Sequence, residues 1–247
     1  MNKKTLVLLH GLNNPPEVLQ TLATHFASKG FKIHLFNLYA HKKGQPLKEQ
    51  TLKECLQHIH YQMLQIPKEE EIYFLGFSQG ALVFELYQMM NLCQHKIKSQ
   101  VLIAPSFYIK RQTIFGLLTK ILPLNTKLFS VTPREFRQFD GLNMSYYRLL
   151  IEQLKVFHKY GMKTLSKVPT LILADAKDEL IDMGRTHAEM LKNNLDNWKI
   201  VYLNRDLKHI KHYGKHHLMF NPDYFSADDW NAMMKEMEIQ FSVTKHK

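Results

Sequence analysis

The fold is decided by the stretch Glu71-Ile72-Tyr73-Phe74-Leu75-Gly76-Phe77-Ser78-Gln79-Gly80-Ala81. A short apolar run ends at Leu75, a Gly-x-Ser-x-Gly turn follows, and a helix-like run begins at Ala81. Strand, turn and helix in this order are typical of the nucleophile elbow, where the chain reverses sharply and holds its serine in a strained conformation. Glycine is needed at 76 and 80 because larger side chains would collide in so tight a turn. We therefore expect the Ser78 hydroxyl to stand clear at the edge of a sheet, above a helix N-terminus that favours negative charge.

Five other short apolar runs flank this stretch and alternate with helix-like segments. The run at residues 5–9 is continuously apolar, as expected for a parallel strand that is buried on both faces. Strands that alternate with helices indicate an α/β fold, here a mostly parallel sheet of about six strands within one domain over residues 1–247. The other predicted strands cover residues 5–9, 31–38, 101–104, 170–174 and 199–203, the predicted helices include 47–66 and 226–241, and the tail 242–247 is expected to fray.

Composition and charge exclude several classes of protein. A chain of 247 residues can bury a full core, and two cysteines are too few for a secreted disulfide scaffold. The first apolar run is shorter than a signal-peptide core, and no run approaches the ~18 apolar residues of a membrane span, so we expect a cytoplasmic protein. The net charge is +11, yet the lysines are scattered and no nucleic-acid motif occurs. We expect no nucleic-acid partner, but transient contact with an anionic membrane surface.

Residues 106–168 interrupt the alternation of strands and helices. The segment holds two or three helix-like stretches and no convincing strand, and apolar residues are mixed with lysines and arginines along it. Ligand sites of open α/β sheets lie outside the carboxyl ends of the strands, where this insertion emerges. We therefore predict a helical lid, or cap, with an apolar underside above Ser78; a purely structural helical insertion is the alternative.

A serine hydroxyl is a weak nucleophile and needs a histidine base that is held in turn by a carboxylate. After a nucleophile elbow, the chain order of the three is serine, acid, histidine. The acid should therefore follow a late strand. Asp178, in the loop after the 170–174 strand, is our choice, and Asp175 is the alternative because it abuts the strand. Asp182 fits a helix N-cap instead.

The base should come from the histidines that follow the last predicted strand, which are His209, His212, His216 and His217. His216 is our choice because it lies in a loop that leads into apolar structure, and His217 is the close alternative. His209 and His212 fit solvated loop positions. A zinc site built from these histidines lacks a matching cysteine or carboxylate pattern, so we expect no metal.

The oxyanion that forms when Ser78 attacks a carbonyl needs two hydrogen-bond donors. The backbone N–H groups of Gln79 and Leu12 are placed for this role, because one follows the nucleophile and the other lies in the loop after the first strand.

These pieces resemble the α/β-hydrolase superfamily, in particular its lysophospholipase, monoglyceride lipase and carboxylesterase-like members. The resemblance implies Ser78 as nucleophile, Asp178 as acid and His216 as base. Two departures stand out. Asp175 occupies a position where the family usually has glycine, and the chain starts at what would be the family's third strand, so we expect the first antiparallel strand pair to be missing. The matching pieces, in family order, are His10-Gly11-Leu12, Gly76-Phe77-Ser78-Gln79-Gly80, Asp178-Glu179-Leu180-Ile181-Asp182 and His216-His217-Leu218-Met219-Phe220.

We therefore expect a serine hydrolase of carboxylic esters that acts on a small-molecule ester with an apolar acyl part, through an acyl-enzyme and without a cofactor. An acyl thioesterase is the nearest alternative, because thioesters use the same nucleophile and oxyanion hole. A catalytically silent binding protein on the same fold is the alternative from another class.

Overall fold

The computed structural model describes residues 4–39, 50–130, 132–165 and 167–242. The beginning of the predicted helix 47–66 and nearly all of the predicted frayed tail lie outside these residues.

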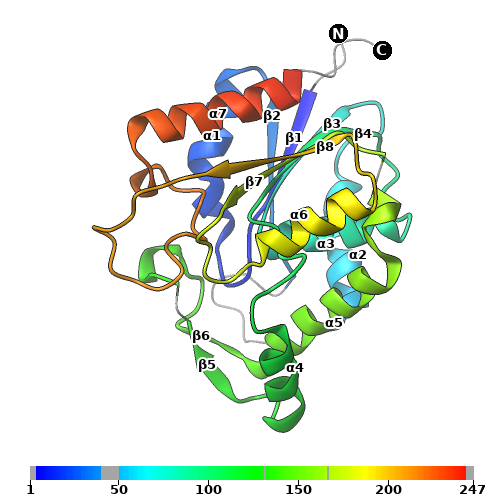
Figure 1. Ribbon diagram of the computed structural model, residues 1–247. Coiled ribbons are helices and arrows are strands. Elements are labelled where there is room, and N and C mark those ends of the chain that lie inside the picture. The colour runs from blue at the N-terminus through cyan, green and yellow to red at the C-terminus, as the bar shows by residue number, and fades with distance from the viewer. Residues whose placement is uncertain (1–3, 40–49, 131, 166, 243–247) are drawn as a thin grey trace.

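One parallel six-stranded sheet forms the centre of the molecule, with strand order β2-β1-β3-β4-β7-β8 (Figure 1). This confirms the α/β fold with about six strands. The neighbouring strands β1 and β3 pair with Leu9 opposite Gly76, so the loop after β1 and the turn at Ser78 lie at the same edge. The strands are β1 (Lys4–Leu9), β2 (Lys32–Phe36), β3 (Glu71–Phe77), β4 (Ile97–Ile103), β7 (Thr170–Asp175) and β8 (Trp198–Leu203).

Helices cover both faces of this sheet (Figure 1). Helices α1 (Gln20–Ser28) and α7 (Ala227–Ser242) pack on one face. The other face carries α2 (Leu52–Met63), α3 (Gln79–Met89), α5 (Met144–Tyr160) and α6 (Met183–Lys192).

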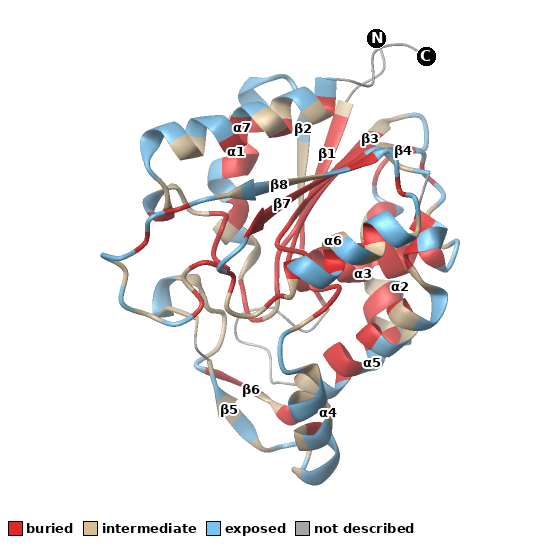
Figure 2. Ribbon diagram, in the orientation of Figure 1, coloured by how far each residue is buried: buried red, intermediate tan, exposed pale blue. Residues whose placement is uncertain are grey.

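Two apolar cores fill the space on either side of the sheet, because successive side chains of a strand point to opposite faces. In β1, Leu6 and Leu8 belong to the core under α1 and α7, whereas Val7 and Leu9 belong to the core under α2 and α3. The four inner strands are buried almost throughout, and the edge strands β2 and β8 are partly exposed (Figure 2). The inner strands therefore supply a rigid platform for whatever stands at their carboxyl ends.

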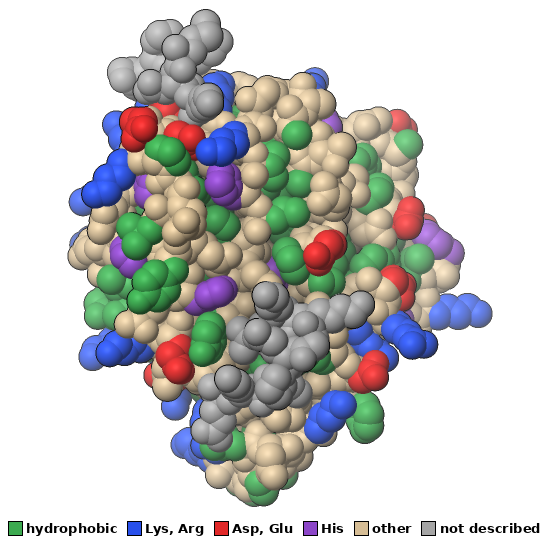
Figure 3. All heavy atoms as spheres, turned by 180° about the vertical axis from the view of Figure 1, so that it is seen from behind, with side chains coloured by type: hydrophobic (Ala, Val, Ile, Leu, Met, Phe, Trp, Pro, Cys, Tyr) green, Lys and Arg blue, Asp and Glu red, His purple; other side chains and the backbone are tan. Residues whose placement is uncertain are grey.

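Lysine and arginine side chains lie scattered around the margin of the face in Figure 3 and do not gather into one stripe there. No helix of the described residues is both long enough and apolar enough to span a bilayer. The cytoplasmic location stays a prediction.

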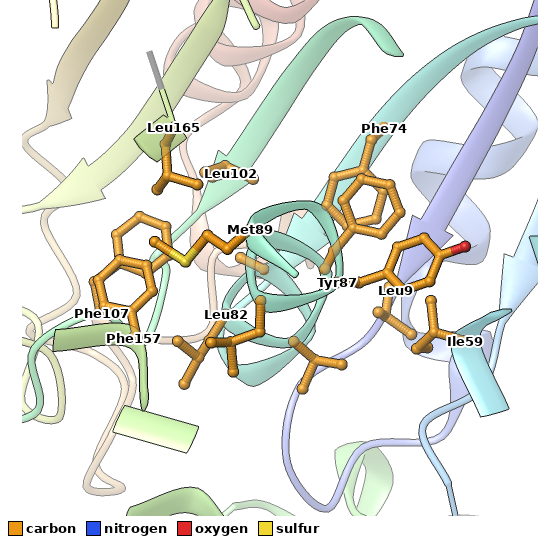
Figure 4. Packing of buried hydrophobic residues seen from close by; sticks show 14 of the residues in the cluster. Leu9, Ile59, Phe74, Leu82, Tyr87, Met89, Leu102, Phe107, Phe157 and Leu165 are labelled. Atoms are coloured by element: carbon orange, nitrogen blue, oxygen red, sulfur yellow. The ribbon is translucent and has the colours of Figure 1, made fainter. Parts of the chain in front are cut away.

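Helix α3, which begins directly after Ser78, is packed on nearly all sides. Every residue of the helix except Gln88 is buried. Phe84 stacks on Phe74 of β3 with ring centroids 3.6 Å apart, and Figure 4 shows α3 enclosed between Phe74 and the stacked pair Phe107 and Phe157. A helix held in this way fixes the position of the turn that precedes it.

Helices α2, α6 and α7 begin at side-chain caps. Thr51 and Glu54 form a capping box at α2, and Asp182 accepts from the backbone N–H of Arg185 at 2.9 Å, as expected of an N-cap. Ser226 likewise accepts from the N–H of Asp229 before α7. These side chains satisfy backbone donors that a helix N-terminus leaves free.

The segment 106–168 is more than helical, which corrects the expectation of no strand. It holds α4 (Gln112–Ile121), then the short strands β5 (Lys127–Phe129) and β6 (Gly141–Asn143), and then α5. The two strands pair in antiparallel fashion, and three residues each is too short for a readable alternation of apolar and polar side chains. In Figure 1, α4 and the β5–β6 hairpin lie below the carboxyl edge of the sheet.

Candidate active site

Ser78 stands in a strained turn between β3 and α3. Its φ of 52° and ψ of −119° are a conformation that side chains rarely adopt. The glycines around it are required by space. A Cβ at Gly80 would lie 2.4 Å from the carbonyl oxygen of His10, and one at Gly76 would lie 2.8 Å from the Cα of Ala81. The Gly-x-Ser-x-Gly turn therefore lets β3, α3 and the end of β1 approach closely at the serine.

A chain of hydrogen bonds joins Ser78, His217 and Asp178. The Ser78 hydroxyl lies 3.0 Å from His217 Nε2, and His217 Nδ1 lies 2.8 Å from Asp178 Oδ2. An ionised carboxylate only accepts, so Nδ1 carries the proton and Nε2 is left to accept from the serine. All three side chains come from loops at the carboxyl edge of the sheet, after β3, β7 and β8.

Asp178 is held as a carboxylate inside the protein. Its Oδ1 accepts from the backbone N–H groups of Leu180 and Ile181 at 2.8 and 2.9 Å. Burial opposes ionisation, but His217 and these two N–H groups outweigh it and hold the pKa of Asp178 below its ordinary value. The side chain is thus charged and oriented toward the imidazole.

His216, our choice of base, makes no hydrogen bond to Ser78 in the part of the chain that the structure describes. Its Nδ1 lies 3.0 Å from Asp175 Oδ2 instead. The N–H of His217 bonds to the carbonyl of Gly214 in a tight turn, and neighbouring residues in a turn point in different directions. The alternative, His217, is the histidine beside Ser78, and Asp175 is the carboxylate of the second pair.

Arg205 links the His216–Asp175 pair to the loop that carries His217. This arginine was not identified from the sequence. The side chain is only 1% exposed. Its Nε donates to Asp175 Oδ2 at 3.0 Å, and its other nitrogens donate to the carbonyl oxygens of His216, Leu218 and Tyr224. An arginine between Asn204 and Asp206 gives a sequence signal of a solvated loop, so no local pattern could have identified it.

Ser106 is a further neighbour of the nucleophile that the sequence did not reveal. Its hydroxyl lies 3.0 Å from the Ser78 hydroxyl, and its backbone N–H donates to the Ser78 carbonyl at 3.2 Å. The residue follows β4 and opens the segment 106–168. The Ser106 hydroxyl can donate to Ser78 Oγ while Ser78 donates to His217. These two hydrogen bonds together hold the Ser78 side chain in one rotamer.

The two predicted oxyanion donors both border the cavity above Ser78. Gln79 is the first residue of α3, so its backbone N–H is one of those that lack an intrahelical partner. Leu12 lies in the turn after β1, where His10 is buried and accepts from the backbone N–H of Leu38 at 3.1 Å. Burial lowers the pKa of His10, which fits its role in holding this turn.

Of the other two histidines of the predicted cluster, His209 is exposed, and His212 has its own partners. His212 Nε2 contacts the hydroxyl of Tyr224 at 2.7 Å. Among the residues that the structure describes, no group of three or more histidine, cysteine or acidic side chains could hold a metal ion.

A cavity of about 440 Å³ opens above Ser78 and His217. Most of its wall is apolar, and the segment 106–168 supplies much of it. The contributing apolar residues of this segment are Ile109, Ile114, Phe115, Leu128, Phe129, Leu142, Leu150 and Ile151. The site can therefore hold an apolar group next to a nucleophile, a base and a carboxylate.

Solved structures with a similar fold include three that are instructive. A soluble variant of monoglyceride lipase from Saccharomyces cerevisiae, in complex with a substrate analog, matches with a TM-score of 0.72 at 12% identity over 100% of this chain and 89% of that one. A monoacylglycerol lipase of Paleococcus ferrophilus gives 0.70 at 15% over 96% of each chain. A thioesterase domain from the curacin biosynthetic pathway gives 0.65 at 14% over 96% and 91%. At such identities the likeness establishes the fold alone.

Sequence comparison adds the family. No curated protein matches the chain. A family model described as serine aminopeptidase, S33 (Hydrolase_4), matches residues 1–223, which is most of the sequence. The match confirms the resemblance drawn from the sequence motifs: the chain belongs to the Hydrolase_4 (serine aminopeptidase, S33) family of the α/β-hydrolase superfamily.

Proposed function

We propose that this protein is a serine hydrolase that cleaves carboxylic esters through an acyl-enzyme. The observation that carries the proposal is the unbroken hydrogen-bond chain from Ser78 through His217 to Asp178 at the wall of an apolar cavity. In this role Ser78 is the nucleophile, His217 the general base and Asp178 the acid that orients it.

The reaction follows from this geometry. As Ser78 Oγ attacks the ester carbonyl, its proton moves to His217 Nε2, and Asp178 stabilises the imidazolium that forms. The backbone N–H groups of Leu12 and Gln79 hold the oxyanion. His217 then gives its proton to the departing alkoxide, which leaves as an alcohol. A water molecule, activated by the same imidazole, hydrolyses the acyl-enzyme and restores Ser78.

The substrate class follows from the wall of the cavity. An acyl chain gains by leaving water for an apolar wall, and the segment 106–168 supplies that wall above the serine. We therefore assign this segment as a lid insertion within a single domain, and an apolar acyl ester as the substrate.

The outer surface of the proposed lid supports transient contact with an anionic membrane. Leu117 and Ile121 of α4, which do not line the cavity above Ser78, are 57% and 67% exposed. They lie one helical turn apart on α4, and Lys120 and Lys127 are cationic neighbours in the sequence. Apolar side chains that insert at the headgroups, with lysines beside them, suit a surface of anionic lipids.

A panel of substrates tests the proposal. Purified protein is expected to hydrolyse p-nitrophenyl acyl esters, with Ser78→Ala losing roughly 10⁴–10⁶-fold in kcat. Acyl thioesters and amino-acid amides in the same panel separate an esterase from a thioesterase and from an aminopeptidase. Equal rates for wild type and Ser78→Ala, or no turnover of any ester, would contradict the proposal, and no turnover of any substrate in the panel would leave a silent binding protein as the better account.

A further inference from the structure

A second hollow lies beside the β5–β6 hairpin, apart from the cavity above Ser78. Its volume is about 460 Å³, and among the described residues the two spaces share no lining residue. Its wall contains the cations Lys127, Arg134 and Arg137 and a single acid, Asp140. Three cations against one carboxylate leave a net positive charge around the hollow, and nothing in the proposed ester hydrolysis uses it.

Two donors at this hollow are buried without a hydrogen-bond partner in the described part of the chain. They are Nε of Arg137 and Nε2 of Gln138. The Arg137 guanidinium is engaged on one side only, because its Nη2 donates to Asp140 Oδ1 at 2.7 Å. A buried donor that has no acceptor destabilises the folded state. These two groups therefore indicate that an acceptor belongs here.

The backbone that carries these donors is already fixed. The N–H of Gln138 donates to the carbonyl of Asn13 at 2.8 Å, and the N–H of Phe139 donates to Asn13 Oδ1 at 3.0 Å. The amide nitrogens of Asn13 and Asn14 donate back to Phe139 and Phe136 at 2.9 and 2.7 Å. Because the loop is held before any ligand arrives, binding does not have to order it.

We propose that this hollow binds a phosphate group. A tetrahedral dianion offers several oxygens at once, so it can accept from Arg137 and Gln138 while Lys127 and Arg134 balance its charge. A carboxylate has two oxygens and one charge, so it satisfies fewer of these groups. The phosphate can belong to a soluble phosphate monoester or to a phospholipid headgroup. The proposal is independent of the Ser78 chemistry.

Calorimetric titration of the full chain with inorganic phosphate at low ionic strength tests the site. We expect saturable binding of one phosphate per chain with a Kd of about 1 mM or lower, and acetate at least about tenfold weaker. Arg137→Gln and the exposed Arg134→Gln should each weaken phosphate binding about tenfold or more. Lys208→Gln, which removes a cation that is 92% exposed and does not line the hollow, should leave binding unchanged.

Vesicle sedimentation separates the two sources of phosphate. The Ser78→Ala protein is mixed with phosphatidylcholine vesicles that either contain or lack phosphatidic acid. Binding that requires phosphatidic acid and is lost in Arg134→Gln assigns the site to a lipid headgroup, whereas binding of free phosphate alone assigns it to a soluble monoester. The proposal is overturned if phosphate fails to saturate, if acetate binds equally well, or if folded Arg134→Gln and Arg137→Gln bind phosphate as the wild type does.

Discussion

Two histidine–aspartate pairs lie next to each other in this protein and differ in what else they touch. His217 with Asp178 and His216 with Asp175 have Nδ1–Oδ2 distances of 2.8 and 3.0 Å, and both aspartates are 1% exposed. Only His217 reaches Ser78. In the other pair, Asp175 Oδ2 also accepts from Arg205 at 3.0 Å.

The comparison shows that the pair itself does not set the role. Asp178 receives two backbone N–H groups and has one imidazole as its partner, so its charge is available to stabilise a histidinium. The charge of Asp175 is already compensated by the guanidinium of Arg205, which also bonds to three carbonyl oxygens of the following loop. We infer that the first pair serves catalysis and that the second holds the loop in place.

Replacing each histidine in turn should produce the largest difference between the pairs. His217→Ala is expected to lose roughly 10⁴–10⁶-fold in kcat, the scale of a triad base. His216→Ala should stay within about tenfold of wild type, since it loses one hydrogen bond that does not reach the serine. Steady-state rates on an acyl ester measure both, and equal losses would remove the distinction.

Replacing the two aspartates should change two different properties, the rate for Asp178 and the stability for Asp175. Asp178→Asn is expected to lower kcat about 10⁴-fold, because the amide favours the wrong histidine tautomer. Asp175→Asn should act mainly on stability, because it leaves the Arg205 charge buried and uncompensated. Rates and urea unfolding, measured on both variants, check this. An Asp175→Asn protein that has normal stability but no turnover would contradict the assignment of Asp175 to the structure of the loop.

Replacing Arg205, the ion-pair partner of Asp175, tests the structural role of the second pair. Arg205→Leu should lower the free energy of unfolding by about 3–5 kcal/mol, since Asp175 is then buried without its partner. The neighbouring Asp206→Asn is the control, because that side chain is 72% exposed and its change should fall within about 0.5 kcal/mol. Chemical denaturation measures both free energies of unfolding. An Arg205→Leu protein that is as stable as the control would show that the Arg205–Asp175 ion pair contributes little to stability.

The smallest expected effect is a change in the free energy of unfolding at acidic pH, which depends on Asp178. The pKa of Asp178 is lowered in the folded protein, so the unfolded chain binds more protons between the two pKa values and stability rises with pH there. The contribution is present above the ordinary pKa of 3.8 and is lost as pH falls through the lower folded value. The stability difference between wild type and Asp178→Asn should therefore shrink below pH 3.8. A difference that stays constant in this range would contradict the shift.

The sequence predicted the sheet well because its signals are local and strong. Continuous apolar runs such as 170–174 indicate buried strands, and the glycines around Ser78 indicate a tight turn. Capping residues such as Asp182 were equally readable. The hairpin of β5 and β6 was not, because strands of three residues carry no period.

Ser78 and Asp178 of the candidate site were predicted to the residue, whereas the histidine beside Ser78 was predicted only to the level of the loop. Which of His216 and His217 faces Ser78 depends on the direction of one side chain within a turn, and a motif does not encode that direction. Arg205 and Ser106 contact the site through residues distant in sequence, at Asp175 and Ser78. Burial of an arginine in a polar loop follows from the tertiary structure alone.

The rate at which a fluorophosphonate probe labels Ser78 tests the central claim most directly, because it reports the nucleophile and its base without any choice of substrate. Labelling should be nearly as fast in His216→Asn as in wild type and should be lost in His217→Asn and Ser78→Ala. Fast labelling of His217→Asn together with loss in His216→Asn would contradict the account.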